Sequence, residues 1–182
     1  MKYFIVCLLF IVNCKAESQL AYHKAFSYIV NDDHVVEFFS VKEKNSFMVS
    51  EKPIPFNLIS ISESLISQNH IEGYSIFQEL TNAQRSLEEA VIDSLERVEK
   101  KANMTYNEES TIQIKKALKR KKGDLTIFFS ETFDRSLYVE VLQTEAVKLG
   151  YKMAYGEALS YLFVFDENND IKEVFKGSIH HN

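Results

Sequence analysis

Cysteine is confined to the start of this 182-residue chain. The two cysteines are Cys7 and Cys14, so residues 17–182 carry no thiol and cannot form an internal disulfide. The domain must therefore be stabilised by its hydrophobic core, and a chain of about 165 residues buries roughly 70% of its unfolded surface without covalent links. The lack of disulfides fits a bacterial cell envelope better than a small eukaryotic secreted module.

Glycine, proline and tryptophan are also scarce. Five glycines, two prolines and no tryptophan leave no room for a collagen-like, low-complexity or linker-rich architecture. Apolar residues make up 46% of the chain and charged residues 26%, which is typical of a globular protein. The net charge of -5 argues against a general nucleic-acid binder, whose domain should be basic, so no nucleic-acid partner is expected.

The N-terminal segment lacks the length of a membrane-spanning helix. Lys2 is followed by the apolar run Tyr3–Val12, and Asn13, Lys15 and Glu17 interrupt the apolar character soon afterwards. A spanning helix needs about 20 apolar residues, whereas a positive start and a short apolar run are typical of a cleaved export signal. We therefore expect residues 1–16 to be a signal peptide and the mature protein to act outside the cytoplasm.

This leader offers two cleavage sites. The segment Ile11-Val12-Asn13-Cys14 resembles the end of a bacterial lipoprotein leader. The resemblance implies cleavage before Cys14, lipid on its thiol and a membrane partner reached through that lipid. Alternatively, Cys14 and Ala16 are the small residues of an ordinary signal-peptidase site, and a soluble periplasmic or secreted chain begins at Glu17. A cysteine directly after an apolar run is uncommon in a cysteine-poor chain, which favours lipidation.

Helical periodicity prevails in the first two thirds of the remaining chain. Over Ile76–Ala102, apolar residues recur at three- and four-residue spacing opposite a charged face, which predicts a surface helix that packs on a core rather than a coiled coil. Weaker patterns predict further helices from an N-cap at Ser18 to Asn31–Asp33, over Phe56–Ser67, and over Ser110–Lys122 with a stop at Gly123.

Strand-forming residues are concentrated in the last third. The sequence predicts strands over Leu125–Phe129, Leu137–Leu142, Ala158–Phe165 and Ile171–Phe175, joined in part by polar turns at 131–135 and 166–170. An earlier hairpin is predicted from Val35–Val41 and Ser46–Ser50, followed by an edge or crossing segment at Pro53 and Pro55.

The strand predicted over Ala158–Phe165 is apolar on both sides. Tyr161, Phe163 and Phe165 should point to one face of the sheet, and Leu162 and Val164 to the other. Such a strand needs cover on both faces. Early helices and a late antiparallel sheet together predict a segregated α+β fold, with residues 17–182 forming a single domain.

A basic run is the densest charge feature of the chain. It comprises Lys115, Lys116, Lys119, Arg120, Lys121 and Lys122. Such a run could contact an anionic surface, at about 1 kcal/mol per cation. The favoured interpretation is the solvated end of a helix, because cations complement the helix dipole there and the apolar face beside them is modest.

The sequence predicts neither a metal site nor a cofactor. Adjacent His180 and His181 lack the spacing of helical metal ligands, and a mobile C-terminal tail is expected there. Asp166, Asn168 and Asp170 have the spacing that opens a calcium loop, but the required glycine is missing at the sixth position. A tight hairpin turn is predicted instead.

No catalytic residue is assigned. The chain lacks a nucleophile elbow, a zinc-protease motif and a P-loop. Glu131, Asp134, Glu140 and Glu157 fall near the predicted strands and could supply the carboxylate pair of a glycoside hydrolase. Asn103-Met104-Thr105 matches the N-glycosylation motif, which is occupied only in a eukaryotic secretory route.

These features favour an exported, lipid-anchored cell-envelope protein with a non-catalytic binding or structural role and no cofactor. The sequence does not identify its protein partner or ligand. One alternative is an exported hydrolase that uses a carboxylate pair. A second is a periplasmic inhibitor or immunity protein, suggested by the small size and the acidity of the chain.

Overall fold

The computed structural model describes residues 19–40, 47–62, 64, 82–112, 123–144 and 156–181, with residues 82–88, 90, 91, 156, 180 and 181 described by their backbone alone. A helix over residues 19–29 comes first and is followed by α2 (Asp33–Phe39), β1 (Phe47–Val49), the 3-10 helix η1 (Leu58–Ile61), α4 (Asn82–Asn103), β2 (Leu125–Phe129), β3 (Ser136–Gln143), β4 (Gly156–Phe165) and β5 (Ile171–His181). Helices lie mainly in the first two thirds and strands mainly in the last third, which confirms the α+β class.

The five strands form one mixed sheet in the order β1-β2-β3-β4-β5. The pairings from β2 to β5 are antiparallel, as predicted. The prediction was wrong for β1, which pairs parallel to β2 with Phe47 opposite Leu125. Parallel neighbours need a long crossover connection, and η1 and α4 both belong to the segment that joins β1 to β2.

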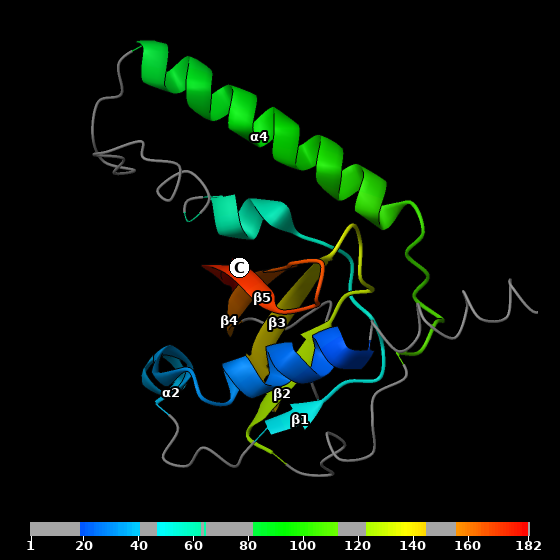
Figure 1. Ribbon diagram of the computed structural model, residues 1–182. Coiled ribbons are helices and arrows are strands. Elements are labelled where there is room, and N and C mark those ends of the chain that lie inside the picture. Colours follow the sequence, from blue (N-terminus) through cyan, green and yellow to red (C-terminus); the bar gives the residue numbers. More distant parts are fainter. Residues whose placement is uncertain are drawn as a thin grey trace, which may run out of the picture.

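One face of the sheet is covered by the helix over residues 19–29 and by α2 (Figure 1). Ala25 and Ile29 of the first helix lie four residues apart on one side of it and are fully buried. They share a core cluster with Val35 of α2 and with Val139 and Phe163 of the strands. The regular spacing of these apolar residues therefore explains why the first helix forms where it was predicted.

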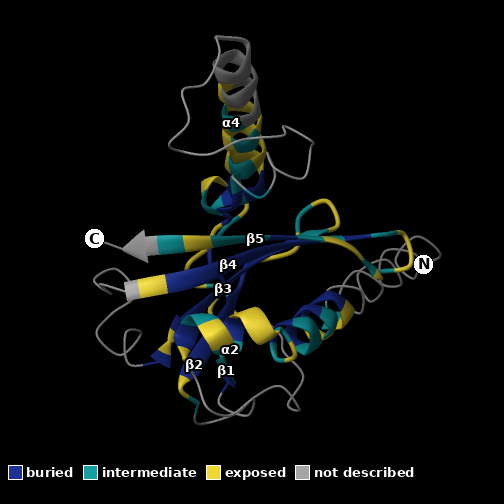
Figure 2. Ribbon diagram, turned by 90° about the vertical axis from the view of Figure 1, so that its left-hand side faces the viewer, coloured by how far each residue is buried: buried dark blue, intermediate teal, exposed yellow. Residues whose placement is uncertain are grey.

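The opposite face is covered by η1, the segment before it, and the C-terminal end of α4. Phe56, Ile61 and Ala102 form a second core cluster with Tyr138 and Phe175 of the sheet. Figure 2 shows that α4 extends away from the sheet and does not lie along it. The helix therefore reaches this core at its C-terminal end, beside η1.

Two side chains fasten that end of α4. The Asn103 Nδ2 donates to the Phe56 carbonyl at 2.9 Å, and the Asn103 Oδ1 accepts from the Phe56 amide at 2.7 Å. The Glu99 Oε2 accepts from the Leu58 amide at 2.6 Å. These bonds satisfy backbone groups that no sheet neighbour could pair. The asparagine of the glycosylation motif is thus a structural clamp in this fold.

The prediction that β4 is covered on both faces is confirmed. Tyr161, Phe163 and Phe165 belong to the first core cluster, and Leu162 belongs to the second, with Val164 packed against it. Because β4 lies between β3 and β5, its backbone is paired on both sides as well. This strand is therefore enclosed in every direction.

The turn between β2 and β3 uses two residues in the left-handed region. Asp134 has a φ of 45° and Arg135 a φ of 58°. Phe133 and Ser136 exchange amide-carbonyl hydrogen bonds of 2.9 and 2.7 Å around them. Positive φ at both central positions gives the tight turn that matches the twist of a hairpin. The turn predicted at 131–135 is confirmed.

The hairpin predicted from Val35–Val41 and Ser46–Ser50 was wrong in its first half. Residues Asp33–Phe39 form α2, and only Phe47–Val49 is a strand. The Asp32 side chain accepts from the His34 amide and caps the helix, while Val35 and Phe39 bury one face of it. The cap and the four-residue spacing outweigh the strand propensity of valine and phenylalanine.

The bounds of several other elements differ from those predicted from the sequence. Within Phe56–Ser67 the structure has η1 over Leu58–Ile61, Ser62 and Ser64 are also helical, and residues 63 and 65–67 lie outside the described part. α4 begins at Asn82, with the predicted residues 76–81 outside the described part. Residues 110–112 of the helix predicted over Ser110–Lys122 are not helical, and the rest lies outside the described residues. His180 and His181 do not form a tail, because they pair with Glu157 and Gly156 in the sheet.

Gly177 allows η1 to approach the sheet. A Cβ atom at this position would lie 1.9 Å from the Ser60 carbonyl oxygen and 2.9 Å from the Ser160 Oγ. Two backbones meet here at a distance that only glycine permits, so the position of η1 depends on the absence of a side chain in β5.

We predict that Gly177→Ala destabilises the domain by about 3 kcal/mol, because the added methyl group must push the η1 backbone away from β5. Ser178→Ala, at the next and exposed position, serves as the control and should change the stability little. Urea unfolding of both variants measures the difference. Equal stability of Gly177→Ala and the unmodified domain would contradict the close approach of η1 to β5.

Candidate functional site

A polar row crosses the otherwise apolar sheet face beneath η1. Glu140 of β3 pairs with Ser160 of β4, and Ser160 pairs with Gly177 of β5. Glu140 is 3% exposed and Ser160 is fully buried. A carboxyl group buried to this degree needs partners to offset its lost hydration. The row is therefore the first place to look for chemistry.

Hydrogen bonds connect this row to η1. The Tyr138 hydroxyl donates to the Glu140 Oε1 at 2.8 Å and lies 3.0 Å from the Ser60 Oγ. The Ser60 Oγ also lies 2.7 Å from the Asn57 carbonyl oxygen, and its single proton serves either that carbonyl or the Tyr138 oxygen. Tyr138, Glu140 and Ser60 thus form a continuous chain from the centre of β3 to the first turn of η1. A second polar pair, Thr126 with Thr144, lies at the edge of the same face with 3.0 Å between the hydroxyls.

This chain has the groups of an acid-base site but is closed to solvent in this structure. Tyr138 is fully buried, and Glu140 is nearly so. General acid-base catalysis requires direct or water-mediated contact with a substrate. The arrangement instead fixes η1 on the sheet, together with the close approach at Gly177.

A second charged group joins the first helix to β5. The Lys176 Nζ lies 2.8 Å from the Asp32 Oδ2, and the Tyr161 hydroxyl donates to the same oxygen at 3.1 Å. The Lys176 Nζ also lies 5.4 Å from the ring centre of Tyr28. The Asp32 Oδ1 caps α2 through the His34 amide. One carboxylate therefore holds α2, β4 and β5 together.

The pKa values of both partners, Asp32 and Lys176, are shifted in the direction that keeps them charged. Burial alone would raise the pKa of Asp32, but the hydrogen bond and charge of Lys176, with the His34 amide and the Tyr161 hydroxyl, hold that pKa below its usual value. Burial alone would lower the pKa of Lys176, but the hydrogen bond and charge of Asp32 raise it. Burial and the Asp32 carboxylate raise the pKa of the Tyr161 hydroxyl. The pair is thus charged and Tyr161 is protonated near neutral pH.

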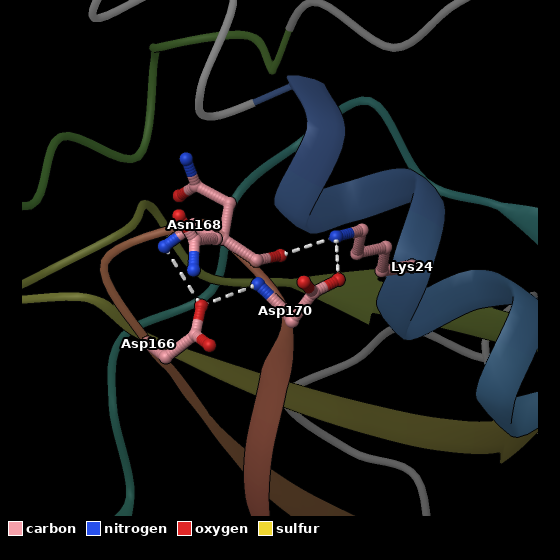
Figure 3. Close-up of polar contacts among 5 residues, drawn as sticks. Lys24, Asp166, Asn168 and Asp170 are labelled. Atoms are coloured by element: carbon pink, nitrogen blue, oxygen red, sulfur yellow. Dashed lines mark hydrogen bonds and ion pairs between the residues drawn. The ribbon is translucent and has the colours of Figure 1, made fainter.

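The tip between β4 and β5 is the predicted turn. The Asp166 Oδ1 accepts from the amides of Asn168 and Asp170, both at 2.8 Å (Figure 3). Asn169 has a φ of 60°. The Lys24 Nζ bonds to the Asn169 carbonyl at 2.7 Å and to the Asp170 Oδ1 at 2.5 Å. These oxygens bind backbone amides and a lysine, which is the arrangement of a capped turn.

Comparison with known proteins assigns no family. The chain matches no family model, no curated protein and no solved structure. The function must therefore be argued from the residues themselves.

The structure separates the carboxylates that the sequence grouped. Glu140 is buried, whereas Glu131, Asp134 and Glu157 are exposed. Among the described residues, no three His, Cys, Asp or Glu side chains come together as a metal site. None of the helices in the described ranges is long and apolar enough to cross a bilayer.

Two predicted sites lie outside the described residues. Cys14, the predicted lipidation site, is one of them. The other is the basic run formed by Lys115, Lys116, Lys119, Arg120, Lys121 and Lys122. Both remain predictions.

Sequence reasoning missed the Tyr138-Glu140-Ser60 chain and the Asp32-Lys176 pair. Glu140 had a usable signal, because in a strand it shares a face with Tyr138 and Leu142, and a carboxylate between two large buried residues needs partners. Asp32 and Lys176 had none, since they lie far apart in the chain and neither is unusual in its local sequence.

We predict that the coupling between Asp32 and Lys176 depends on pH at both ends of the scale. The lowered pKa of Asp32 stabilises the fold above its unfolded value of about 4, and this stabilisation is lost as the pH falls below it. The raised pKa of Lys176 stabilises the fold below its unfolded value of about 10.4, and this is lost as the pH rises further.

A double-mutant cycle with Asp32→Asn and Lys176→Met, followed by urea unfolding, should give a coupling of about 1 kcal/mol near neutral pH. The coupling should shrink as the pH falls through the folded-state pKa of Asp32, which lies below its unfolded value. The exposed Lys172-Glu173 pair, with 3.7 Å between its charged atoms, is the control and should show almost none. A coupling that is unchanged in acid would contradict the ionic nature of the contact.

Proposed function

We propose that this chain is an exported cell-envelope protein, anchored to the membrane by lipid on Cys14, whose domain has a non-catalytic binding or structural role. The observation that carries the proposal is the leader: Lys2, the apolar run Tyr3–Val12 and then Cys14. That order is typical of a signal peptide, and the cysteine at its end is typical of lipid attachment.

The proposed cleavage is compatible with the described fold. The described members of the two core clusters begin at Ala21. A mature chain that begins at Cys14 or at Glu17 would therefore keep every described core residue.

The burial of the carboxylates favours a binding role over the hydrolase alternative. Glycoside hydrolysis needs two carboxyl groups on either side of a substrate, roughly 5 to 9.5 Å apart. Of the four candidates, only Glu140 is buried, and the Tyr138 hydroxyl already binds it. The other three are exposed and lie at turns or strand ends. Such an arrangement offers no described pair in a shared cleft.

The orientation of α4 supports a protein partner. The helix extends away from the sheet (Figure 2). Among its described side chains, Glu99 and Asn103 bond to the segment around η1, and Ala102 and the partly buried Leu95 pack in the second core cluster. Val98 belongs to the apolar stripe that was expected to pack on the core, yet it is 45% exposed. An apolar side chain on a projecting helix is a suitable contact point for another protein.

The lipid anchor is tested by intact-mass analysis of the membrane fraction of cells that make the full-length chain. We expect the unmodified protein to begin at Cys14, to carry acyl mass and to sediment with membranes. Cys14→Ser should abolish the acyl mass and release the protein. Cys7→Ser is the matched control, because Cys7 leaves with the signal peptide and its loss should change nothing. A soluble wild-type chain that begins at Glu17 would refute the anchor.

A further inference from the structure

The first helix starts at one end of the sheet. We call this end the hairpin end and define it by the turns at residues 131–135 and 166–170. The Lys24 Nζ bonds to the Asn169 carbonyl at 2.7 Å, and the Tyr22 hydroxyl bonds to the Ser130 carbonyl at 3.4 Å. Further along, Tyr28 contacts Phe163 with 5.4 Å between ring centres. The helix thus runs from the hairpin end toward the middle of β4.

The distance from Cys14 to this helix is short. Five residues of fully extended chain span at most about 18 Å, so residue 19, the first described residue of the helix, lies within about 18 Å of the Cys14 backbone. The opposite end of the sheet is separated from the hairpin end by most of the length of β5. Along β5, Ser178 lies about 23 Å beyond Ile171 at the hairpin end.

We infer that the anchored domain faces the bilayer with its hairpin end. The opposite end of the sheet, where β4 begins at Gly156 and β5 ends at His181, then points away from the bilayer. This orientation rests on the proposed lipid anchor at Cys14. It follows from the short reach of the chain and from the contacts that fix the first helix on the hairpin end. The surface concerned is made of the two turns, and it faces the lipid headgroup layer.

The charge of the hairpin end determines how closely this end can approach an anionic lipid bilayer. The two turns carry five carboxylates and one cation, Arg135, and Lys24 of the first helix contacts one of the carboxylates. The five are Glu131, Asp134, Asp166, Glu167 and Asp170. Two of them are partly neutralised, because Asp170 binds Lys24 and Glu167 lies 3.7 Å from Arg135. The remaining negative charge repels anionic headgroups over about one Debye length, roughly 10 Å at moderate salt. The domain should therefore face an anionic membrane without adhering to it.

Single-cysteine labelling of the mature lipoprotein tests this orientation. Once Cys14 is acylated and Cys7 has left with the leader, no free thiol remains. Asn168→Cys places a fluorescent donor at the hairpin end, and Ser178→Cys, also exposed and uncharged, places it near the far end. The purified lipoproteins are bound to phosphatidylcholine vesicles that carry an acceptor on the lipid headgroup.

Energy transfer from the label at position 168 should be at least about twofold more efficient than from position 178, given the separation of the two sites along β5. Replacing phosphatidylcholine by phosphatidylglycerol at low salt should reduce the transfer from position 168, and added salt should restore it. Higher transfer on phosphatidylglycerol would contradict the repulsion.

Equal or reversed efficiencies in vesicle-bound protein would overturn the orientation while leaving the anchor intact. Protein that lacks acyl mass and stays in the supernatant would overturn the anchor itself, and the orientation with it. The two failures are thus distinguished by mass and sedimentation before any fluorescence is read.

Discussion

The burial of β4 on both faces is the constraint on which the rest of the fold depends. Its side chains alternate between two separate core clusters, so neither face of the sheet can be left to solvent. Exposing either cluster would cost about 1.5 to 3 kcal/mol of apolar transfer free energy for each large side chain uncovered. Different elements cover the two faces: the helix over residues 19–29 and α2 cover one, and η1, the segment before it and the C-terminal end of α4 cover the other.

The sheet face covered by η1 and the end of α4 depends more on specific contacts than the other face does. A short element such as η1 buries little apolar area by itself, so it is held by specific contacts: the missing side chain at Gly177, the polar chain from Ser60 to Glu140, and the clamp at Asn103. Each joins segments that are far apart in sequence. α4 itself extends away from the sheet, and this orientation is the feature that supports the proposed binding role.

Local patterns predicted those elements whose burial is regular. The strand at Ala158–Phe165 was found with its faces correctly assigned, because a period of two is visible in the residues themselves. α2 was mistaken for a strand, because its valines and phenylalanines favour extended structure and the capping role of Asp32 was not recognised. The parallel pairing of β1 could not be predicted, since nothing near Phe47 indicates a partner at Leu125.

The candidate site was less predictable than the fold. Its polar contacts join residues such as Ser60 and Tyr138, or Asp32 and Lys176, whose proximity arises only when both faces of the sheet are covered. The sequence did identify the carboxylates near the strands, but their burial, which separates Glu140 from the others, is a property of the packed sheet. The leader is different, because an export signal is read as an extended segment and its information lies in the sequence alone.

The central claim, that β4 is enclosed on both faces and both edges, is tested most directly by native-state hydrogen exchange of the mature domain, resolved by residue. Amides of β3 and β4, including those of Val139, Tyr161 and Phe163, should exchange only through global unfolding, while the outward amides of β5 and those of β1 exchange through local opening. Amides of β4 that exchange as fast as the outward amides of β5 would contradict it.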